Sequence, residues 1–419
     1  MRVGIVGGGG AGLTTAWLLD RHHDVILLER EARLGGHADT VDIEAHGRRL
    51  RVDAGFEFFS PGTTYAGFNR LLDALGVVRE TYDATLTVFD MRAQHPIAMP
   101  PMRGGRPILP SFSPASLRTL LRFRAFLDDL PAFLARRDTT VTIGEYLERA
   151  RLPKPFVEGF LLPLLLAFWC VERAEFLGFA AYNALYYLGE NATSGFRAPV
   201  QSTIVGGMRV YVDAIVDSLE RTEVRRGAEV VRVERLDGTW QVTDAVGRTD
   251  AFDRLVLACN PKRAHALVGH IPSLAGIAGE LARFETFTTT IAIHGDRRLM
   301  PAHEASWSVV NARLHGERSS LSVWNPRLGL PVFKSWVTFD ERMPHPLHAV
   351  VTYEHGRITP DYFDAQARLA PLNGTEGLWL AGLAMHDADS HESAVRSAMT
   401  VAEGLAPDSA RLRTLVAPG

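Results

Sequence analysis

Hydrophobic positions at the start of the chain form two short apolar runs with a helical pattern between them. Residues 2–6 (RVGIV) and 24–28 (DVILL) have the length and the branched side chains of buried strands. Between them, the glycine-rich stretch at 7–12 leads into LTTAWLLDR, which has the pattern of a helix. The N-terminus is therefore predicted to fold as strand, tight turn, helix and second strand.

The glycine-rich stretch has the spacing G-x-G-x-x-G at Gly7, Gly9 and Gly12. The first glycine permits the tight turn, the second lets the backbone approach a pyrophosphate, and the third allows close packing of helix on strand. Gly10 and Ala11 begin the helix, whose free N–H groups and positive dipole end favour phosphate. This pattern predicts a dinucleotide-binding turn.

An acidic residue, Glu29, stands at the end of the second predicted strand. A carboxylate there can accept hydrogen bonds from a ribose 2′-OH, whereas an arginine would suit a 2′-phosphate. NADP is therefore disfavoured.

The stretch ExxxRxGGH at 29–37 resembles the ExxxRxGGR signature of the flavin amine oxidase, protoporphyrinogen oxidase and phytoene desaturase superfamily. The resemblance implies that Gly35 and Gly36 let the backbone wrap the pyrophosphate of FAD, and that Arg30 belongs to the same cofactor site. His37 stands where the superfamily has an arginine that helps to bind the pyrophosphate. This replacement is a departure from the pattern beside the phosphates.

Two later segments resemble the same superfamily in the same order. Residues 52–57 (VDAGFE) are similar to the strand and loop that pass the flavin ring, which implies that Gly55 and Phe56 lie at the cofactor. A glycine is expected at that point because a side chain would collide with the ring. Val230 is expected to hold the adenine through its backbone.

The last apolar strand ends at Gly382, and a helical pattern follows from about Ser393. In the superfamily this glycine contacts the ribityl–phosphate portion, and the helix points its N-terminus at the flavin. The resemblance thus implies cofactor contacts for His391 and Glu392. An alternative is that Ser390 or His391 caps the helix and Glu392 is only an acid in its first turn.

The resemblance spans the whole chain and implies an α/β fold of the GR2 flavoprotein type. A Rossmann-like FAD-binding domain is expected at 1–75, 200–265 and 371–419, with an interleaved α+β substrate-binding domain at 76–199 and 266–370. A closer resemblance is to a bacterial branch of predicted NAD/FAD-binding proteins with lipid desaturase-like members.

That closer resemblance rests on the HxD at 294–296, on Met300-Pro301, on Trp307 and on the His391-Glu392 pair. Residues 384–393 differ from the glycine-rich loop of the branch, so the substrate or the reaction is expected to differ as well.

Two helical patterns dominate the first insert. Residues 116–137 alternate leucine or phenylalanine with arginine, which is typical of a solvated amphipathic helix; docking on a membrane surface or an anionic substrate is the alternative. Residues 156–188 are strongly apolar and aromatic, as in a buried helical core. The functional alternative is a pocket wall for an apolar substrate, with Trp169, Tyr182 and Tyr187 as contacts.

Strand-like stretches at 288–293, 306–310 and 321–324 predict a sheet that roofs the flavin. Trp307 and Trp324 are candidate cage residues there, with Trp324 taken as a substrate contact.

Composition narrows the class of protein. The chain has 419 residues, 46% of them hydrophobic, and a formal net charge of −3, which gives no reason to expect a nucleic-acid partner. Its two cysteines are far apart and predict neither a metal site nor a disulfide framework. No signal peptide is visible, and Pro163 interrupts the longest apolar run, at 160–170. A cytoplasmic protein without a transmembrane segment is expected, with peripheral membrane contact left open.

We expect FAD to be bound non-covalently, because the covalent cysteinyl attachment common in the superfamily needs a cysteine shortly before the C-terminal motif, and none stands there. Lys334 is the only lysine in a plausible segment for chemistry, and His391 is the second candidate catalytic residue. The expected activity is oxidation or desaturation of an apolar or amphipathic small molecule by hydride transfer to flavin N5.

Three alternatives to this activity remain at this point. A flavin-dependent isomerase or mutase would use the same frame without net redox change. A non-catalytic FAD-binding module would bind the cofactor alone. An NAD-dependent dehydrogenase is the weakest alternative, because it leaves the GGH stretch and the C-terminal segment unexplained.

Overall fold

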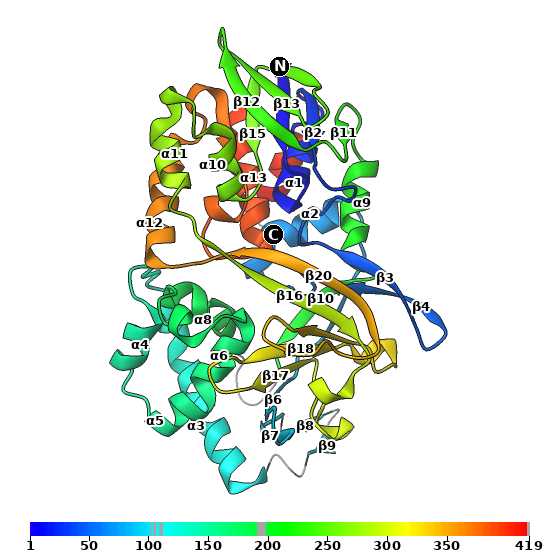
Figure 1. Cartoon of the computed structure of the whole chain (residues 1–419), viewed down its shortest axis with the longest axis vertical. Helices are drawn as coiled ribbons and strands as arrows, with labels where there is room; N and C mark the ends of the chain where they lie inside the picture. Colours follow the sequence, from blue (N-terminus) through cyan, green and yellow to red (C-terminus); the bar gives the residue numbers. More distant parts are fainter. Residues whose placement is uncertain (101, 104–105, 109–111, 191–197, 417–419) are drawn as a thin grey trace.

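The computed structural model has two halves, each built on its own β-sheet (Figure 1). The structure describes residues 1–100, 102–103, 106–108, 112–190 and 198–416. In Figure 1 the upper half contains the N-terminus and a five-stranded sheet, and the lower half contains a seven-stranded sheet with a group of helices beside it.

The upper sheet is parallel throughout, in the order β11-β2-β1-β15-β21. Its strands are β1 (Arg2–Val6), β2 (Asp24–Leu28), β11 (Glu223–Arg225), β15 (Arg254–Leu257) and β21 (Leu378–Leu380). Parallel pairing brings the carboxyl ends of segments that are far apart in the sequence to one edge. The predicted α/β class and the first two predicted strands are confirmed.

Both faces of this sheet are covered, which explains why its strands are apolar without alternation. Leu255 and Leu257 of β15 pack in one hydrophobic cluster, and Val256 between them packs in another. The second cluster includes α1 (Gly10–Leu19) and α13 (His391–Leu405).

The first cluster includes side chains of α10 (Pro261–Val268), α11 (Ala275–Leu281) and α12 (Pro360–Leu369), which lie beside the upper sheet in Figure 1. Within the segment 266–370, which was predicted to belong to the substrate-binding domain, the strands of the lower sheet occupy only the stretch from Thr286 to Gly356. A small antiparallel sheet stands at the top, and it consists of β12 (Val230–Leu236), β13 (Thr239–Asp244) and β14 (Thr249–Phe252).

The lower sheet has the order β20-β16-β19-β18-β17-β6-β7. Its strands are β6 (Leu86–Asp90), β7 (His95–Ala98), β16 (Thr286–His294), β17 (Val310–Leu314), β18 (Ser320–Trp324), β19 (Phe333–Trp336) and β20 (Leu347–Gly356). The strands predicted at 288–293 and 321–324 are confirmed.

The strand predicted at 306–310 is wrong, because the strand begins only at Val310. Before Val310, backbone amides bind side chains instead of a neighbouring strand. The amide of Ser308 donates to Oδ1 of Asn311 (3.0 Å), and the amide of Val309 donates to Oγ1 of Thr85 (3.1 Å). The apolar run there is a buried loop.

The helices of the lower half form the apolar core that the sequence predicted for 156–188. They are α3 (Pro114–Leu134), α4 (Ile143–Arg149), α5 (Lys154–Phe156), a π-helical turn (Val157–Leu161), α6 (Leu162–Trp169), α7 (Arg173–Phe176) and α8 (Ala181–Glu190). Pro163 lies in the first turn of α6, directly after the π-helical turn.

The remaining elements connect the halves or lie at their edges. They are β3 (Thr40–Ala45), β4 (Arg48–Asp53), α2 (Ala66–Ala74), β5 (Arg79–Asp83), β8 (Met102–Arg103), β9 (Arg106–Pro107), β10 (Val200–Ile204), α9 (Arg209–Asp217) and α14 (Ala410–Val416). No helix within the described residues is both long and apolar enough to span a membrane.

We predict that the Gly12→Ala substitution lowers the free energy of unfolding by about 3 kcal/mol, because a Cβ there would lie 1.8 Å from the carbonyl oxygen of Gly7. The control is Gly279→Ala in α11, where a Cβ meets nothing within 4 Å and helix propensity favours alanine by up to about 1 kcal/mol. Urea unfolding of both variants measures the difference. Equal effects at the two positions would contradict the assigned packing of α1 on β1.

Candidate functional site

The N-terminus of α1 is buried: Gly10, Ala11 and Gly12 are all shielded from solvent. No side chain caps this helix start. A helix start of this kind leaves backbone N–H groups without helical acceptors, and an anion satisfies them well. The turn at Gly36 faces it: a Cβ on Gly9 would lie 3.9 Å from the Gly36 Cα, and a Cβ on Gly36 would lie 3.2 Å from the Gly9 Cα. We call residues 7–12 and 35–36 together the glycine cradle.

A third glycine turn has the same character. Gly382 follows β21 with φ of +128°, a conformation that side chains rarely adopt, and an added Cβ would meet nothing within 4 Å. The backbone there borders open space, with its amide held by Oγ of Ser397 (2.8 Å). An uncapped helix start and glycine turns beside open space are features that fit a dinucleotide.

The carboxylate of Glu29 is fixed at the tip of β2. It accepts the amide of Gly8 at 2.6 Å on one oxygen and the amide of Glu31 at 2.8 Å on the other. Its remaining lone pairs are free to accept ribose hydroxyls, as predicted. The side chain of Arg30 is exposed and pairs with Glu31 at 3.1 Å.

The carbonyl of Val230, predicted to hold the adenine, accepts a hydrogen bond from Nη2 of Arg263 at 2.7 Å. A carbonyl oxygen has a second lone pair, so this bond leaves one acceptor position for a ligand. The neighbouring amide of Ala228 donates to the carbonyl of Glu29 at 2.7 Å, which ties this segment to the end of β2.

The cation at the glycine cradle is Arg33, which was absent from the predicted site residues. Its Nη1 donates to the carbonyl of Gly36 at 2.8 Å, and its Nη2 lies 3.0 Å from the Asp39 carboxylate. The arginine of the ExxxR pattern was the signal that could have identified it.

His37, in contrast, packs its ring 5.1 Å from that of His355, and burial lowers its pKa to about 4. His37 is therefore neutral near pH 7 and gives no positive charge to a phosphate.

Asp53 joins the segments around the cradle. Its Oδ1 accepts the hydroxyl of Thr40 at 2.5 Å and the amide of Met208 at 2.9 Å. The amide of Arg209 in turn donates to Thr40 Oγ1 at 2.8 Å. Burial, followed by the charge of Glu57, raises the pKa of Asp53 to about 6.

Gly55 is required by the protein itself. A Cβ there would lie 2.1 Å from the carbonyl oxygen of His37, and that same carbonyl accepts the amide of Phe56 at 2.8 Å. The glycine was predicted here to avoid a collision with the flavin ring, and the contact with the His37 carbonyl already excludes a side chain.

His391 lies between the glycine cradle and the loop at Phe56. Its ring stacks on that of Phe56, with centroids 4.5 Å apart, and its Nε2 lies 2.8 Å from the hydroxyl of Tyr211. A Cβ on Gly10 would lie 2.7 Å from His391 Cε1. Burial lowers the pKa of His391 to about 3, so the ring is neutral near pH 7. This position suits the predicted cofactor contact better than proton transfer.

The carboxylate of Glu392, which was predicted to contact the cofactor, is held by donors of the protein itself. It accepts the amides of Gly67 and Phe68, at 2.8 and 2.7 Å, and so caps α2. Arg396 donates to the same carboxylate at 2.6 Å. Ser390 is the N-cap of α13, as the capping alternative predicted, with its hydroxyl accepting the amide of Ser393.

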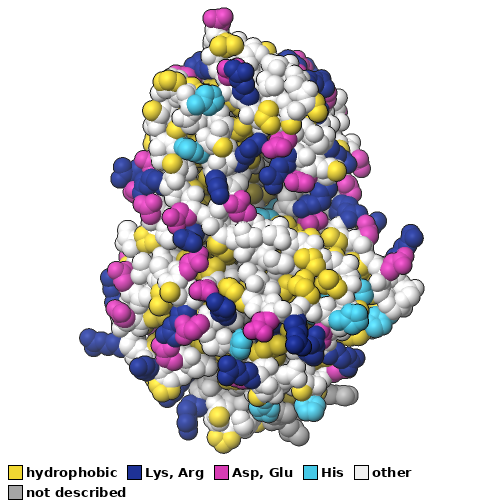
Figure 2. Space-filling model, in the orientation of Figure 1, with side chains coloured by type: hydrophobic (Ala, Val, Ile, Leu, Met, Phe, Trp, Pro, Cys, Tyr) yellow, Lys and Arg dark blue, Asp and Glu magenta, His cyan; other side chains and the backbone are white. Residues whose placement is uncertain are grey.

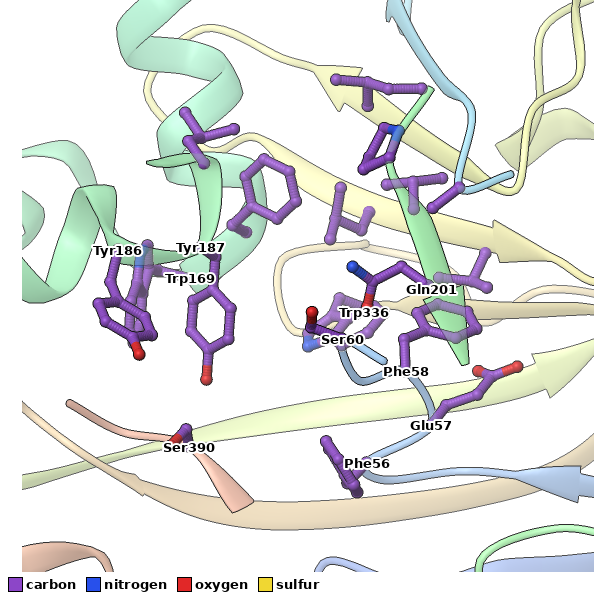
Figure 3. A pocket seen from close by; sticks show the side chains of 18 of the residues that line it. Phe56, Glu57, Phe58, Ser60, Trp169, Tyr186, Tyr187, Gln201, Trp336 and Ser390 are labelled. Atoms are coloured by element: carbon purple, nitrogen blue, oxygen red, sulfur yellow. The ribbon is translucent and has the colours of Figure 1, made fainter. Parts of the chain in front are cut away.

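A cavity of about 550 Å³ extends from the cradle side into the lower half (Figure 3). Figure 3 shows Trp169, Tyr186 and Tyr187 on the helical side, and Gln201 and Trp336 on the strand side. Its lining is mostly apolar and aromatic. The end nearest the cradle is lined by His37, Gly55, Phe56, Tyr353, Leu383 and His391.

Of the predicted substrate contacts, Trp169 and Tyr187 line this cavity, and Tyr182 and Trp324 do not. The Tyr182 ring is buried in the helical core, and its hydroxyl donates to Asp387 at 3.0 Å. Trp324 packs in a separate small cluster with Trp307. Neither tryptophan of the predicted cage therefore reaches the cavity.

Lys334 lines the cavity and forms a buried ion pair with Glu57. Its ammonium group also donates to the carbonyl of Gly55 at 3.2 Å. Lys334 was predicted as a candidate catalytic residue, and it lies at the Gly55 loop. Its carboxylate partner, Glu57, was not predicted. Glu57 directly follows the VDAGF stretch, but a pairing with a residue so distant in the sequence leaves no local signal.

A family model described as flavin containing amine oxidoreductase matches residues 11–280, more than half of the chain. No curated protein sequence matches.

Among solved structures, cyclohexylamine oxidase from Brevibacterium oxydans is similar, with a TM-score of 0.69 and 15% identity over 97% of this chain and 99% of that one. A redesigned putrescine oxidase has a TM-score of 0.68 and 14% identity, over 98% and 100% of the two chains. A fatty acid isomerase from P. acnes that produces CLA has a TM-score of 0.66 and 14% identity, over 96% and 98%. At these identities the structural likeness establishes the fold.

The histidines at the cradle end predict a loss of stability in acid. Burial lowers the pKa of His355 from 6.5 to about 3, so between these values the unfolded chain binds a proton that the folded chain does not. The free energy of unfolding should therefore fall as the pH drops below about 6.5. His355→Gln should flatten this slope by up to about 1.4 kcal/mol per pH unit.

Urea unfolding between pH 7 and pH 4 measures this slope, and His303→Gln at an exposed histidine is the control. An unchanged slope in His355→Gln would show that His355 is protonated in the folded state.

Proposed function

The chain belongs to the family of flavin-containing amine oxidoreductases, and we propose that it oxidises an apolar or amphipathic small molecule held in the 550 Å³ cavity, by hydride transfer to the N5 atom of FAD. The observation that carries this proposal is continuity: His391 packs against Gly10 of the glycine cradle and also lines the cavity. Phe56, which stacks on His391, lines the same end of the cavity. A cofactor in the glycine cradle would therefore reach the end of the cavity that His391 lines.

The family establishes a flavin, in agreement with the expected FAD. We propose that the uncapped start of α1 binds the pyrophosphate, that Arg33 supplies the positive charge beside it, and that Glu29 binds the ribose. At Gly382 the backbone borders open space, which leaves room for the cofactor beside this turn. Attachment remains predicted as non-covalent, since no cysteine stands shortly before the C-terminal motif.

FAD, when bound, supplies the hydride acceptor. The protein contributes orientation and exclusion of water, and the aromatic walls formed by Trp169, Tyr186 and Tyr187 suit both tasks. We propose Lys334 as the residue that orders a proton-carrying group at the cavity wall, since its ammonium is held between Glu57 and the Gly55 carbonyl. His391 is assigned to holding the cofactor, because its ring is neutral and hydrogen-bonded to Tyr211.

The shape and lining of the cavity favour a largely uncharged ligand. The ammonium of Lys334 is neutralised by Glu57, and the neighbouring His37 and His355 are uncharged near pH 7. An anionic substrate would lose its hydration without gaining a free counter-ion among these groups. Asp389 also lines the cavity, and burial raises the pKa of its carboxyl to about 6. Anaerobic mixing with long-chain alcohols, fatty acids, cyclic alkenes and alkyl amines is the direct assay: substrate-dependent bleaching of the flavin absorbance supports oxidation, and turnover that leaves the flavin spectrum unchanged would favour an isomerase.

We predict that Glu29→Gln weakens FAD binding by roughly 10- to 100-fold, because hydrogen bonds to a charged group contribute about 1.5–3 kcal/mol. Titration of flavin-free protein with FAD, followed by flavin fluorescence, measures the dissociation constant. Glu31→Gln, an exposed acid two residues away, is the matched control and should bind FAD as the parent does. Equal affinities for the two variants would contradict the assigned ribose site.

We predict that Ser60→Phe lowers kcat/KM at least roughly tenfold for the best substrate of that panel while the flavin content stays unchanged, because the added ring fills cavity volume. Ser60→Ala separates the lost hydroxyl, which accepts the Gly62 amide at 3.1 Å, from the added bulk. Full activity of Ser60→Phe would show that the substrate binds elsewhere.

A further inference from the structure

Helix α3 (Pro114–Leu134) presents apolar side chains to two different environments. Leu120, Phe123 and Leu127 line the cavity. On another face of the same helix, Leu117 and Leu121 are 37% and 60% exposed to solvent. One helix, about 10 Å thick, therefore separates the cavity from an exposed apolar surface.

The exposed face carries positive charge without acidic neighbours. Arg118 and Arg122 are exposed and lie next to the two leucines in sequence. No acidic residue occurs between Phe112 and Leu127, and within the described part of the chain neither guanidinium has an acidic partner. The first acid on the helix is Asp128, which pairs with Arg124.

This combination differs from the surface around it. On the face shown in Figure 2, acidic and basic side chains are interspersed over most of the molecule. Helix α3 lies at the lower end in Figure 1, far from the five-stranded sheet, so a flat surface can reach it without touching the upper half. Its start is well defined, with Ser113 as N-cap and Pro114 in the first turn.

We propose that this face, formed by Phe112, Leu117, Arg118, Leu121 and Arg122 and called the docking face below, binds the surface of a lipid bilayer that contains anionic phospholipids. The arginine side chains would contact lipid phosphates, and the apolar side chains would enter the interface between headgroups and acyl chains. A bilayer so placed lies one helix away from the apolar cavity.

Charge complementarity selects this occupant over a second copy of the chain. Two docking faces brought together would oppose arginine to arginine, with no acid on the face to compensate. The row of exposed side chains also follows a single helix, which suits a shallow interfacial contact better than a protein interface of standard size. The proposal extends beyond the chemistry of the site and does not depend on which substrate is oxidised.

Co-sedimentation of the flavin-loaded protein with vesicles tests the proposal. Vesicles of phosphatidylcholine with 30% phosphatidylglycerol should sediment the protein at low salt, and vesicles of phosphatidylcholine alone should not; the 30% content is about that of a strongly anionic membrane surface. Arg118→Gln/Arg122→Gln should lower the partition coefficient roughly thirty-fold, because each arginine near such a surface contributes about a factor of five. Leu117→Ser/Leu121→Ser should lower it at least roughly tenfold.

The matched control is Leu236→Ser/Val246→Ser, which removes two apolar side chains exposed at 53% and 86% on the small upper sheet. This variant should bind anionic vesicles as the parent does. Flavin absorbance of every preparation reports folding and cofactor content independently of binding, so loss of the proposed function is distinguishable from loss of docking.

Absence of parent binding to anionic vesicles overturns the proposal, as does an equal loss in the control variant. Size-exclusion chromatography covers the competing occupant: a dimer that Leu117→Ser/Leu121→Ser converts to monomer, without vesicle binding, would assign the face to self-association.

Discussion

The site depends on one constraint, a helix start that is buried and left without a side-chain cap. The N–H groups at Gly10, Ala11 and Gly12 have no acceptor in the helix, and their burial makes them costly unless an anion binds them. Side chains are excluded by the packing that creates this start, since a Cβ on Gly12 would strike the Gly7 carbonyl. The same lack of side chains that brings α1 onto β1 therefore opens the cradle to a pyrophosphate.

Around this start, contacts between distant segments hold each wall in place. Asp53 binds Thr40 and the amide of Met208, which fixes the loop before Gly55 against the turn that begins α9. Glu392 caps α2 and so joins the C-terminal helix to the segment after that loop. Two carboxylates thus accept backbone amides from segments that lie 155 and 325 residues away in sequence. These links are structural, yet they set the position of Phe56 and His391, the two side chains that border both cradle and cavity.

Local patterns predicted the first strand, turn, helix and second strand of the upper half well, because these elements depend on the backbone. Gly7, Gly9, Gly12 and Glu29 follow one another within a single strand–turn–helix–strand unit, where spacing alone determines position. Prediction failed where the facing of a side chain depends on tertiary packing. Tyr182 and Tyr187 lie on the same helix, α8, and only Tyr187 reaches the cavity. The aromatic character of the segment was visible in the sequence, and the direction of each ring was not.

Pairings across the fold account for the remaining misses. Glu57 and Lys334 meet only because the Gly55 loop lies against β19, and neither residue carries a local mark of its partner. Within this ion pair the two charges balance, and the histidines beside it are neutral near pH 7. A ligand entering from water would have to shed hydration to reach it, whereas an apolar ligand entering from a bilayer would exchange one apolar environment for another. The apolar wall of the cavity and the apolar, basic face of α3 therefore favour the same class of ligand.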